Sequence, residues 1–219
     1  MTLPRFRDRR EAGRAIAEAL DDVRGDSPVV FGIPRGGVVL ADEIASALDA
    51  PLDVLVVRKL GYPQHEEAGF GAVGEDGVIV PEHLADLRAG DPGYEVVHQV
   101  REGKQAEVVE RVRRYRGDRP RTAVSGRAAI VADDGIATGY TFAAGLAIVR
   151  REGPRRLIAA VPVASFEGAS FVSGYCDQLV TLGTADRGLF FAVSLYYDEF
   201  PQVSDEDVVR LLSSRAGPR

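Results

Sequence analysis

The chain repeats one structural unit: a short apolar run, a turn of small residues, and a segment with apolar side chains at helical spacing. In the first unit, residues 28–33 are mostly apolar, a glycine-rich turn follows, and residues 38–48 place leucine, isoleucine and alanine at helical intervals. The same order returns at 128–132 and 141–151. Strands that alternate with helices form a parallel sheet covered on both faces. We therefore predict an α/β fold with a mostly parallel, doubly wound sheet and helices on both faces.

Further elements follow from the same patterns. Asp8 and Glu11 have the spacing of a capping box, which predicts that a helix begins there. Residues 60–77 are rich in glycine and contain Pro63, so we expect a long mobile loop. The other expected elements are, in chain order, a helix over 9–23, a strand over 52–57, a short strand at 78–80, a long amphipathic helix over 94–115, strands over 157–163 and 178–182, and a helix over 206–212.

The composition excludes several classes of protein. The 219 residues are 45% hydrophobic and 27% charged, as in globular proteins, and no apolar run approaches the ~20 residues of a membrane span. A net charge of −6 argues against broad nucleic-acid binding, although the basic segment 101–127 leaves a nucleic-acid-binding helix as an alternative. The single cysteine, Cys176, excludes an intramolecular disulfide, and an N-terminus without an apolar signal region makes a cytoplasmic location the expectation.

The segment from Ala129 to Thr141 carries the strongest functional signal. Its apolar strand ends in Asp133 and Asp134, and a loop of small residues then leads into a helix. In doubly wound sheets, ligands bind at the carboxyl ends of the strands, which is where this loop is expected. The backbone N–H groups and the positive dipole end at a helix N-terminus favour a phosphate. The residues expected to bind that phosphate are Ala137, Thr138, Gly139, Tyr140 and Thr141.

The two acids suggest what else the ligand carries. Ionised Asp133 and Asp134 are hydrogen-bond acceptors, which suits them to the vicinal hydroxyls of a sugar. A phosphate site beside a diol site indicates a sugar phosphate. The alternative is that both acids only reflect the preference for negative charge near a helix N-terminus.

This segment resembles the phosphoribosyl pyrophosphate (PRPP) binding motif of the type I phosphoribosyltransferases, in which a strand, two acids and a Thr-Gly-x-Thr-like loop follow one another. The similarity extends to Gly32-Ile-Pro-Arg-Gly-Gly37, which matches the family's pyrophosphate loop, and to Arg58-Lys59, which matches its basic pyrophosphate contacts. It covers roughly residues 28–165 and looks like a branch of predicted phosphoribosyltransferases that share both loops.

The resemblance implies a PRPP-dependent transferase that moves a 5-phosphoribosyl group onto a nitrogenous acceptor, a nucleobase, and releases magnesium pyrophosphate. Asp133 and Asp134 would hold the ribose, and residues 137–141 would bind the 5-phosphate. Mg²⁺ would be held mainly through PRPP and pyrophosphate oxygens, with no metal site of the protein's own. The implied pyrophosphate contacts are Arg35, Gly36 and Gly37, and the implied catalytic residues, which stabilise charge on the leaving group, are Arg35, Arg58 and Lys59.

The resemblance also implies a single domain over 1–219, with a core at about 28–182 and a small irregular hood over the acceptor. The C-terminal tail, at about 183–205, and the 60–77 loop would form this hood. His65 would be either a further pyrophosphate contact or a solvated loop residue. A homodimer is the assembly that the family suggests. The tail carries an aromatic cluster of Phe190, Phe191, Tyr196, Tyr197 and Phe200. Its rings are candidates for stacking on a planar base, Phe190, Phe191 and Tyr196 first, with core packing as their alternative role.

Two positions depart from the family pattern. Ala137 stands where purine-salvage relatives carry a carboxylate that acts on the base, and Tyr140 is bulkier than the residue often found there. The alternative function is a regulatory protein that senses PRPP without turnover. The intact Arg35 favours an enzyme over such a sensor.

Overall fold

A five-stranded parallel sheet forms the centre of the molecule. The computed structural model describes residues 3–63 and 65–215, apart from the side chains of 65–68. All neighbouring strands of the central sheet pair in parallel, which confirms the predicted fold class. In spatial order the strands are β2 (Leu52–Val54), β1 (Val29–Gly32), β6 (Ala128–Ala132), β7 (Arg156–Ser165) and β8 (Gln178–Ala185).

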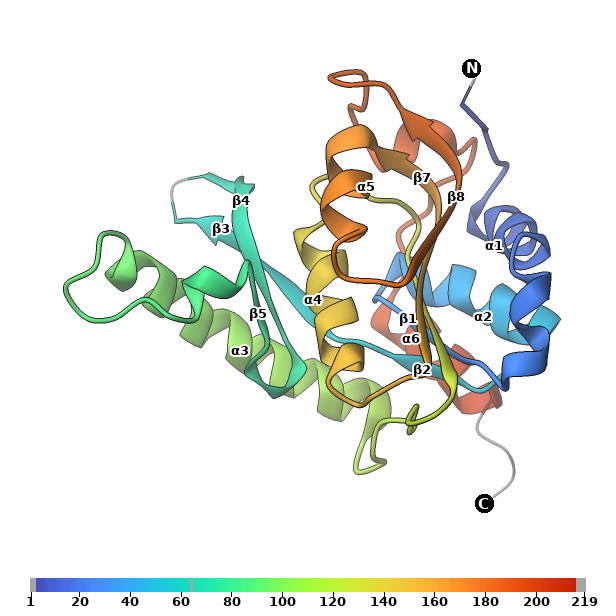
Figure 1. Cartoon of the computed structure of the whole chain (residues 1–219), viewed down its shortest axis with the longest axis horizontal. Coiled ribbons are helices and arrows are strands. Elements are labelled where there is room, and N and C mark those ends of the chain that lie inside the picture. The colour runs from blue at the N-terminus through green and yellow to red at the C-terminus, as the bar shows by residue number, and fades with distance from the viewer. Residues whose placement is uncertain (1–2, 64, 216–219) are drawn as a thin grey trace.

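Helices cover both faces of this sheet, as Figure 1 shows. On one face lie α1 (Arg9–Glu18) and α2 (Gly36–Leu48), and on the other lie α4 (Tyr140–Arg150) and α5 (Phe166–Val172). Because side chains alternate along a strand, Val30 and Ile130 pack towards α1 and α2, while Phe31 and Val131 pack towards α4. Two buried apolar layers therefore hold the central strands, whose carboxyl ends all lie at one edge of the sheet.

A second, antiparallel sheet replaces the loop that the glycine content predicts at 60–77. Its strands are β3 (Val57–Tyr62), β4 (His65–Gly74) and β5 (Ile79–Val80), and Figure 1 shows it projecting from the central sheet. The prediction of an irregular loop is therefore wrong, and so is the expected continuous strand over 52–57, which divides into β2 and β3. The glycines reflect close packing: a Cβ added at Gly71 would lie 2.6 Å from the carbonyl oxygen of Val80, and one at Gly74 would lie 2.5 Å from Cδ1 of Ile148.

The long helix α3 (Tyr94–Arg116) packs against this second sheet. It continues without a break through Gly103, and Val97 on it joins Leu60 and Val73 in a small separate apolar core. Its C-terminal end is fixed by a buried ion-pair network, because the Arg116 guanidinium contacts the carboxylates of Asp53 (3.2 Å) and Glu75 (2.9 Å). The second sheet and α3 thus form one packed unit beside the central sheet.

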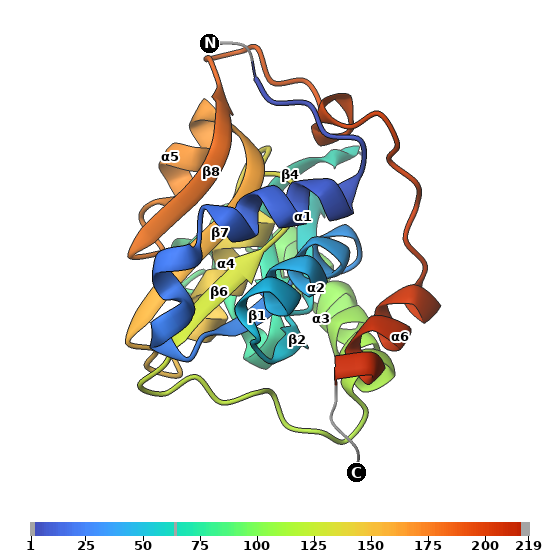
Figure 2. The ribbon, with the colours of Figure 1, turned by 90° about the vertical axis from the view of Figure 1, so that its right-hand side faces the viewer.

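The N-terminal segment lies beside the tail that precedes the last helix. The N–H of Phe6 donates to the carbonyl of Tyr196 at 2.9 Å, and Figure 2 shows the N-terminal segment beside the tail that precedes α6 (Asp205–Arg215). The 3₁₀ helices are η1 (Asp21–Asp26), η2 (Glu75–Gly77), η3 (Glu82–Leu84) and η4 (Val193–Tyr196). Among residues 3–63 and 65–215, no helix is both long and apolar enough to cross a membrane.

Candidate functional site

Two loops that are far apart in sequence meet at the carboxyl edge of the central sheet. β1 and β6 are neighbours in parallel, so the loops after Gly32 and after Ala132 emerge side by side. A Cβ added at Gly36 would lie 2.1 Å from Oδ2 of Asp134, and one at Gly37 would lie 2.7 Å from Oδ1 of Asp133. A Cβ at Gly37 would also lie 2.8 Å from the carbonyl oxygen of Ala132, so this position requires glycine, whereas a Cβ at Gly36 would displace the side chains of Asp134 and Arg9. The predicted pyrophosphate loop and the predicted ribose-binding acids therefore form one cluster.

The loop over 137–141 presents unpaired backbone donors. The Ser165 hydroxyl donates a hydrogen bond to the carbonyl of Ala137. Both the N–H and the carbonyl of Ile136 form hydrogen bonds with β7, so the start of the loop is fixed. Gly139 has φ +84° and directly precedes α4. Within residues 3–63 and 65–215, no hydrogen bond is donated by the backbone N–H groups of 137–141. The arrangement is one that can bind a phosphate at the start of a helix.

The two acids of the cluster differ in their surroundings. Oδ1 of Asp133 accepts a hydrogen bond of 2.8 Å from the N–H of Asp134, whereas Oδ2 of Asp134 accepts one of 2.7 Å from Nε of Arg9. Burial raises the pKa of Asp133 well above its ordinary range, and the nearby Asp134 carboxylate raises it further. Burial also raises the pKa of Asp134, while the Arg9 charge opposes that shift. One acid is thus paired with a cation and the other is not.

Sequence reasoning did not predict the contacts around Asp134, although Tyr197 and Phe200 belong to the aromatic cluster that it singled out in the tail. Arg9 is buried, its guanidinium carbon lies 3.6 Å from the centre of the Phe200 ring, and its Nη1 donates to the carbonyl of Pro201 at 2.7 Å. The Tyr197 hydroxyl donates to the backbone carbonyl of Asp134 at 2.6 Å. A sequence signal for Arg9 existed, because it continues the buried stripe of α1 that holds Ala12 and Ile16 and so places a cation on an apolar face.

The three predicted catalytic residues lie in different places. Arg35 is half-buried and directly precedes α2, next to Gly36 in the chain, and its charge contributes to lowering the pKa of Asp205 on α6. Arg58 lies on β3, where its Nη2 is 3.0 Å from Oε2 of Glu107 on α3. Lys59 extends across β4, since a Cβ added at Gly69 would lie 2.2 Å from its Cε. Roles for Arg58 and Lys59 at the leaving group remain predictions.

The aromatic residues of the tail do not form a single surface. The rings of Phe190 and Tyr196 stack at 5.3 Å and pack against the core, whereas Phe191 is 80% exposed. The structure therefore supports core packing as the role of Phe190 and Tyr196. Base stacking stays a prediction for Phe190, Phe191 and Tyr196. The side chain of His65 lies outside the described residues.

Comparison with known proteins identifies the family. A model of the phosphoribosyl transferase domain matches residues 7–198, which is most of the chain. The chain belongs to the phosphoribosyl transferase family. A Mycobacterium tuberculosis protein named "Putative phosphoribosyl transferase" is 44% identical over 209 residues, which are 94% of this chain and 46% of that protein. The chain therefore spans about half the length of the curated relatives that it matches.

Two solved structures are similar to this chain. The TT1426 protein of Thermus thermophilus is 42% identical with a TM-score of 0.81, over 97% of this chain and all of that chain (100%). The AQ2163 protein of Aquifex aeolicus is 12% identical with a TM-score of 0.53, over 82% of this chain and 76% of that chain, which shows likeness of fold alone.

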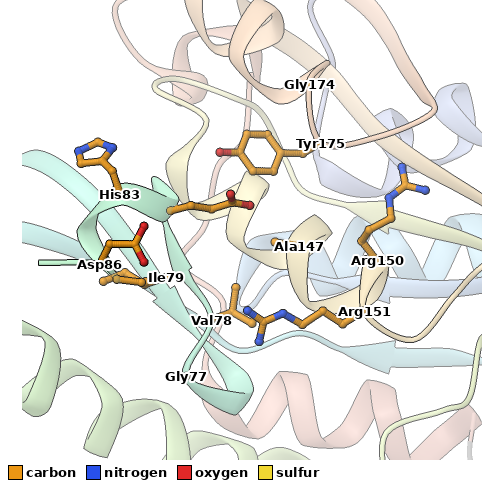
Figure 3. A pocket seen from close by; sticks show the side chains of 12 residues that line it. Gly77, Val78, Ile79, His83, Asp86, Ala147, Arg150, Arg151, Gly174 and Tyr175 are labelled. Carbon is orange, nitrogen blue, oxygen red and sulfur yellow. The ribbon is translucent and has the colours of Figure 1, made fainter.

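A cavity at the far end of α4 lies outside this phosphoribosyl transferase cluster. It measures about 850 Å³ and lies between η3 and the C-terminal end of α4, as Figure 3 shows. Its walls mix Glu82 and Asp86 with Arg150 and Arg151, and Arg150 is already paired with Asp177. None of the predicted site residues lines it. In the described part of the chain, no group of three or more His, Cys, Asp or Glu side chains is placed to hold a metal ion.

Proposed function

We propose that this chain transfers the 5-phosphoribosyl group of PRPP to a ring or amino nitrogen of an acceptor base. The observation that carries the proposal is the contact between the loop of Gly36 and Gly37 and the acids Asp133 and Asp134, beside the unpaired N–H groups of 137–141. A pyrophosphate loop, a diol site and a phosphate site thus adjoin one another, as the three parts of PRPP do.

Each part of the site has a role in this reaction. The amides of 137–141 bind the 5-phosphate, and the Asp133 carboxylate accepts hydrogen bonds from the ribose hydroxyls. The bond from the anomeric carbon to pyrophosphate breaks and its electron pair leaves with the pyrophosphate. The lone pair of the acceptor nitrogen forms the new bond to that carbon, and the proton that this nitrogen carried is released to solvent. Negative charge grows on the departing pyrophosphate, where Arg35 and the amides of Gly36 and Gly37 stabilise it.

Mg²⁺, which the family implies, would contribute by neutralising pyrophosphate oxygens. The donors present fit such an arrangement, because Asp133 supplies a carboxylate oxygen beside the pyrophosphate loop and the substrate and water supply the rest.

The test is pyrophosphate release from PRPP and Mg²⁺ in the presence of a panel of nitrogenous bases. We expect release with at least one base and loss of release in Asp133→Asn. PRPP binding without release for any base would instead support a regulatory PRPP sensor. Absence of PRPP binding would contradict both functions.

A further inference from the structure

A second cavity adjoins the first turn of α4. It measures about 850 Å³ and lies between the β3–β4 hairpin and the segment that runs from Pro81 to Val97. This volume is within the range of small-molecule sites. The side chains that line it include Tyr62, Phe70, Leu84, Leu87, Val96 and Tyr140.

Tyr140 joins this cavity to the candidate phosphate site. Its backbone N–H belongs to the loop of 137–141, while its side chain lines the cavity. The ring packs edge-on against Phe171, with ring centres 5.1 Å apart at 74°, so it forms a fixed wall. None of Phe190, Phe191 and Tyr196, the acceptor contacts predicted from the sequence, lines this cavity.

The walls favour one class of ligand. Tyr62 and Phe70 contact each other, with ring centres 5.0 Å apart. Tyr62 and Val96 present apolar surface to solvent, since 50% and 38% of these residues are exposed. The described lining residues include no Lys, Arg, Asp or Glu, and their polar side-chain groups are the two tyrosine hydroxyls and the imidazole of His83. An anion would lose its hydration here without gaining a strong cationic partner, whereas a neutral ring can stack and make a few hydrogen bonds.

We infer that this cavity is the acceptor site and that it takes a neutral, planar nitrogen heterocycle in preference to one that carries a carboxylate. The inference rests on the proposed function, since it assigns the second substrate of that reaction. It moves the acceptor from the C-terminal tail to the unit built by the second sheet and α3.

The chain contains no tryptophan, which allows a direct test by fluorescence. Val96→Trp places a single reporter at the cavity, and Val109→Trp places one on the same helix, about 20 Å away along its axis. Both valines are exposed, Val109 at 56%, so both variants should fold. Benzimidazole serves as the neutral probe and orotate as the carboxylated one.

We expect benzimidazole to change the emission of Val96→Trp saturably and to leave Val109→Trp unchanged, with no saturable effect of orotate on either variant. An equal response of both variants, no response, or binding of orotate as tight as that of benzimidazole would overturn the inference.

A second measurement avoids dependence on the tryptophan variants. Ligand-observed NMR of benzimidazole with the unmodified chain and with Tyr62→Ala should show roughly three- to tenfold weaker binding to the variant, the effect of one lost aromatic contact. Phe191→Ala is the matched control, and weakening by Phe191→Ala alone would return the acceptor to the tail and contradict the inference.

Failure of the inference can be told from failure of the proposed function. If PRPP binds and pyrophosphate is released with a base that does not compete with benzimidazole, the cavity is not the acceptor site but the transferase stands. If benzimidazole binds as expected and PRPP does not bind at all, the proposed function fails, and the acceptor assignment fails with it.

Discussion

Nε of Arg9 lies 2.7 Å from Oδ2 of Asp134, and the two side chains are only 9% and 16% exposed. This contact joins the N-terminal helix to the loop after β6 and gives one of two adjacent acids a permanent counter-charge. Asp133 has no such partner among the described residues and instead accepts from the backbone. The two acids look equivalent in the sequence but differ in the structure. Asp134 is paired with Arg9, whereas Asp133 is available to a ligand.

Removing Arg9 should destabilise the protein strongly. Arg9→Met leaves Asp134 buried without its cation, which typically costs about 3–5 kcal/mol in the free energy of unfolding. Urea unfolding of Arg9→Met, Asp134→Asn and the double variant measures this cost and the coupling between the two sites. We expect the double variant to be more stable than the sum of the two losses predicts, and simple additivity would count against the ion pair.

The stability of the free protein should depend on the ionisation of Asp133. Its pKa is raised in the folded state, so the folded state binds a proton more tightly than the unfolded state does. The contribution of this group to stability is complete below its ordinary pKa of 3.8 and is lost as the pH rises through the raised value. Unfolding free energies of the parent chain and of Asp133→Asn should therefore diverge in favour of the variant as the pH rises above 3.8. A difference that stays constant with pH would disprove the shift.

Arg35 should act mainly on the departing pyrophosphate. We expect Arg35→Ala to lower kcat by an amount equal to about 2–4 kcal/mol of barrier, because one preorganised donor for developing charge is lost. Its effect on the Kd of PRPP should be smaller, since the charge on the leaving group is greatest in the transition state. Steady-state kinetics and calorimetry give the two quantities, and equal losses in both would argue against a leaving-group role.

Gly36→Ala should damage the site without a general effect on folding. The new Cβ would meet Oδ2 of Asp134 at 2.1 Å, so the carboxylate or the loop must move. We expect PRPP binding to be lost and stability to fall by about 1–3 kcal/mol. The matched control is Gly103→Ala on α3, where a Cβ would meet no atom within 4 Å. That substitution should stabilise the helix by roughly 0.5–1 kcal/mol and leave PRPP binding unchanged. Retained PRPP binding in Gly36→Ala would show that the two loops are not one site.

The sequence predicts the central sheet well because its signals are local. The apolar runs at 128–132 and 28–33 precede small-residue turns, and they form β6 and β1 almost as expected. The capping prediction is also confirmed, since the Asp8 side chain accepts from the N–H of Glu11. The short helix α5 was missed, although the Ser165 hydroxyl caps it by accepting from the N–H of Gly168.

What the sequence could not show depends on contacts between distant residues. The glycines of 60–77 are typical of a loop. At Gly71 and Gly74, however, a neighbouring strand and α4 approach so closely that a larger side chain would collide with them. The pairing of Arg9 with Asp134 spans most of the chain, so the α1 pattern that signals a buried Arg9 does not identify its partner. The motifs thus predicted that the loop of Gly36 and Gly37 meets the two acids at the edge of the sheet. They did not predict that one of these acids, Asp134, is paired with an arginine.

The proposed reaction requires Asp133 and the loop of 137–141 to bind PRPP. Calorimetric titration of PRPP with Mg²⁺ into the parent chain and into Asp133→Asn tests that claim directly, with circular dichroism as the check that the variant is folded. We expect saturable binding to the parent chain and loss of that binding in the variant. Equal affinity of the two proteins, or no binding to the parent chain, would contradict it.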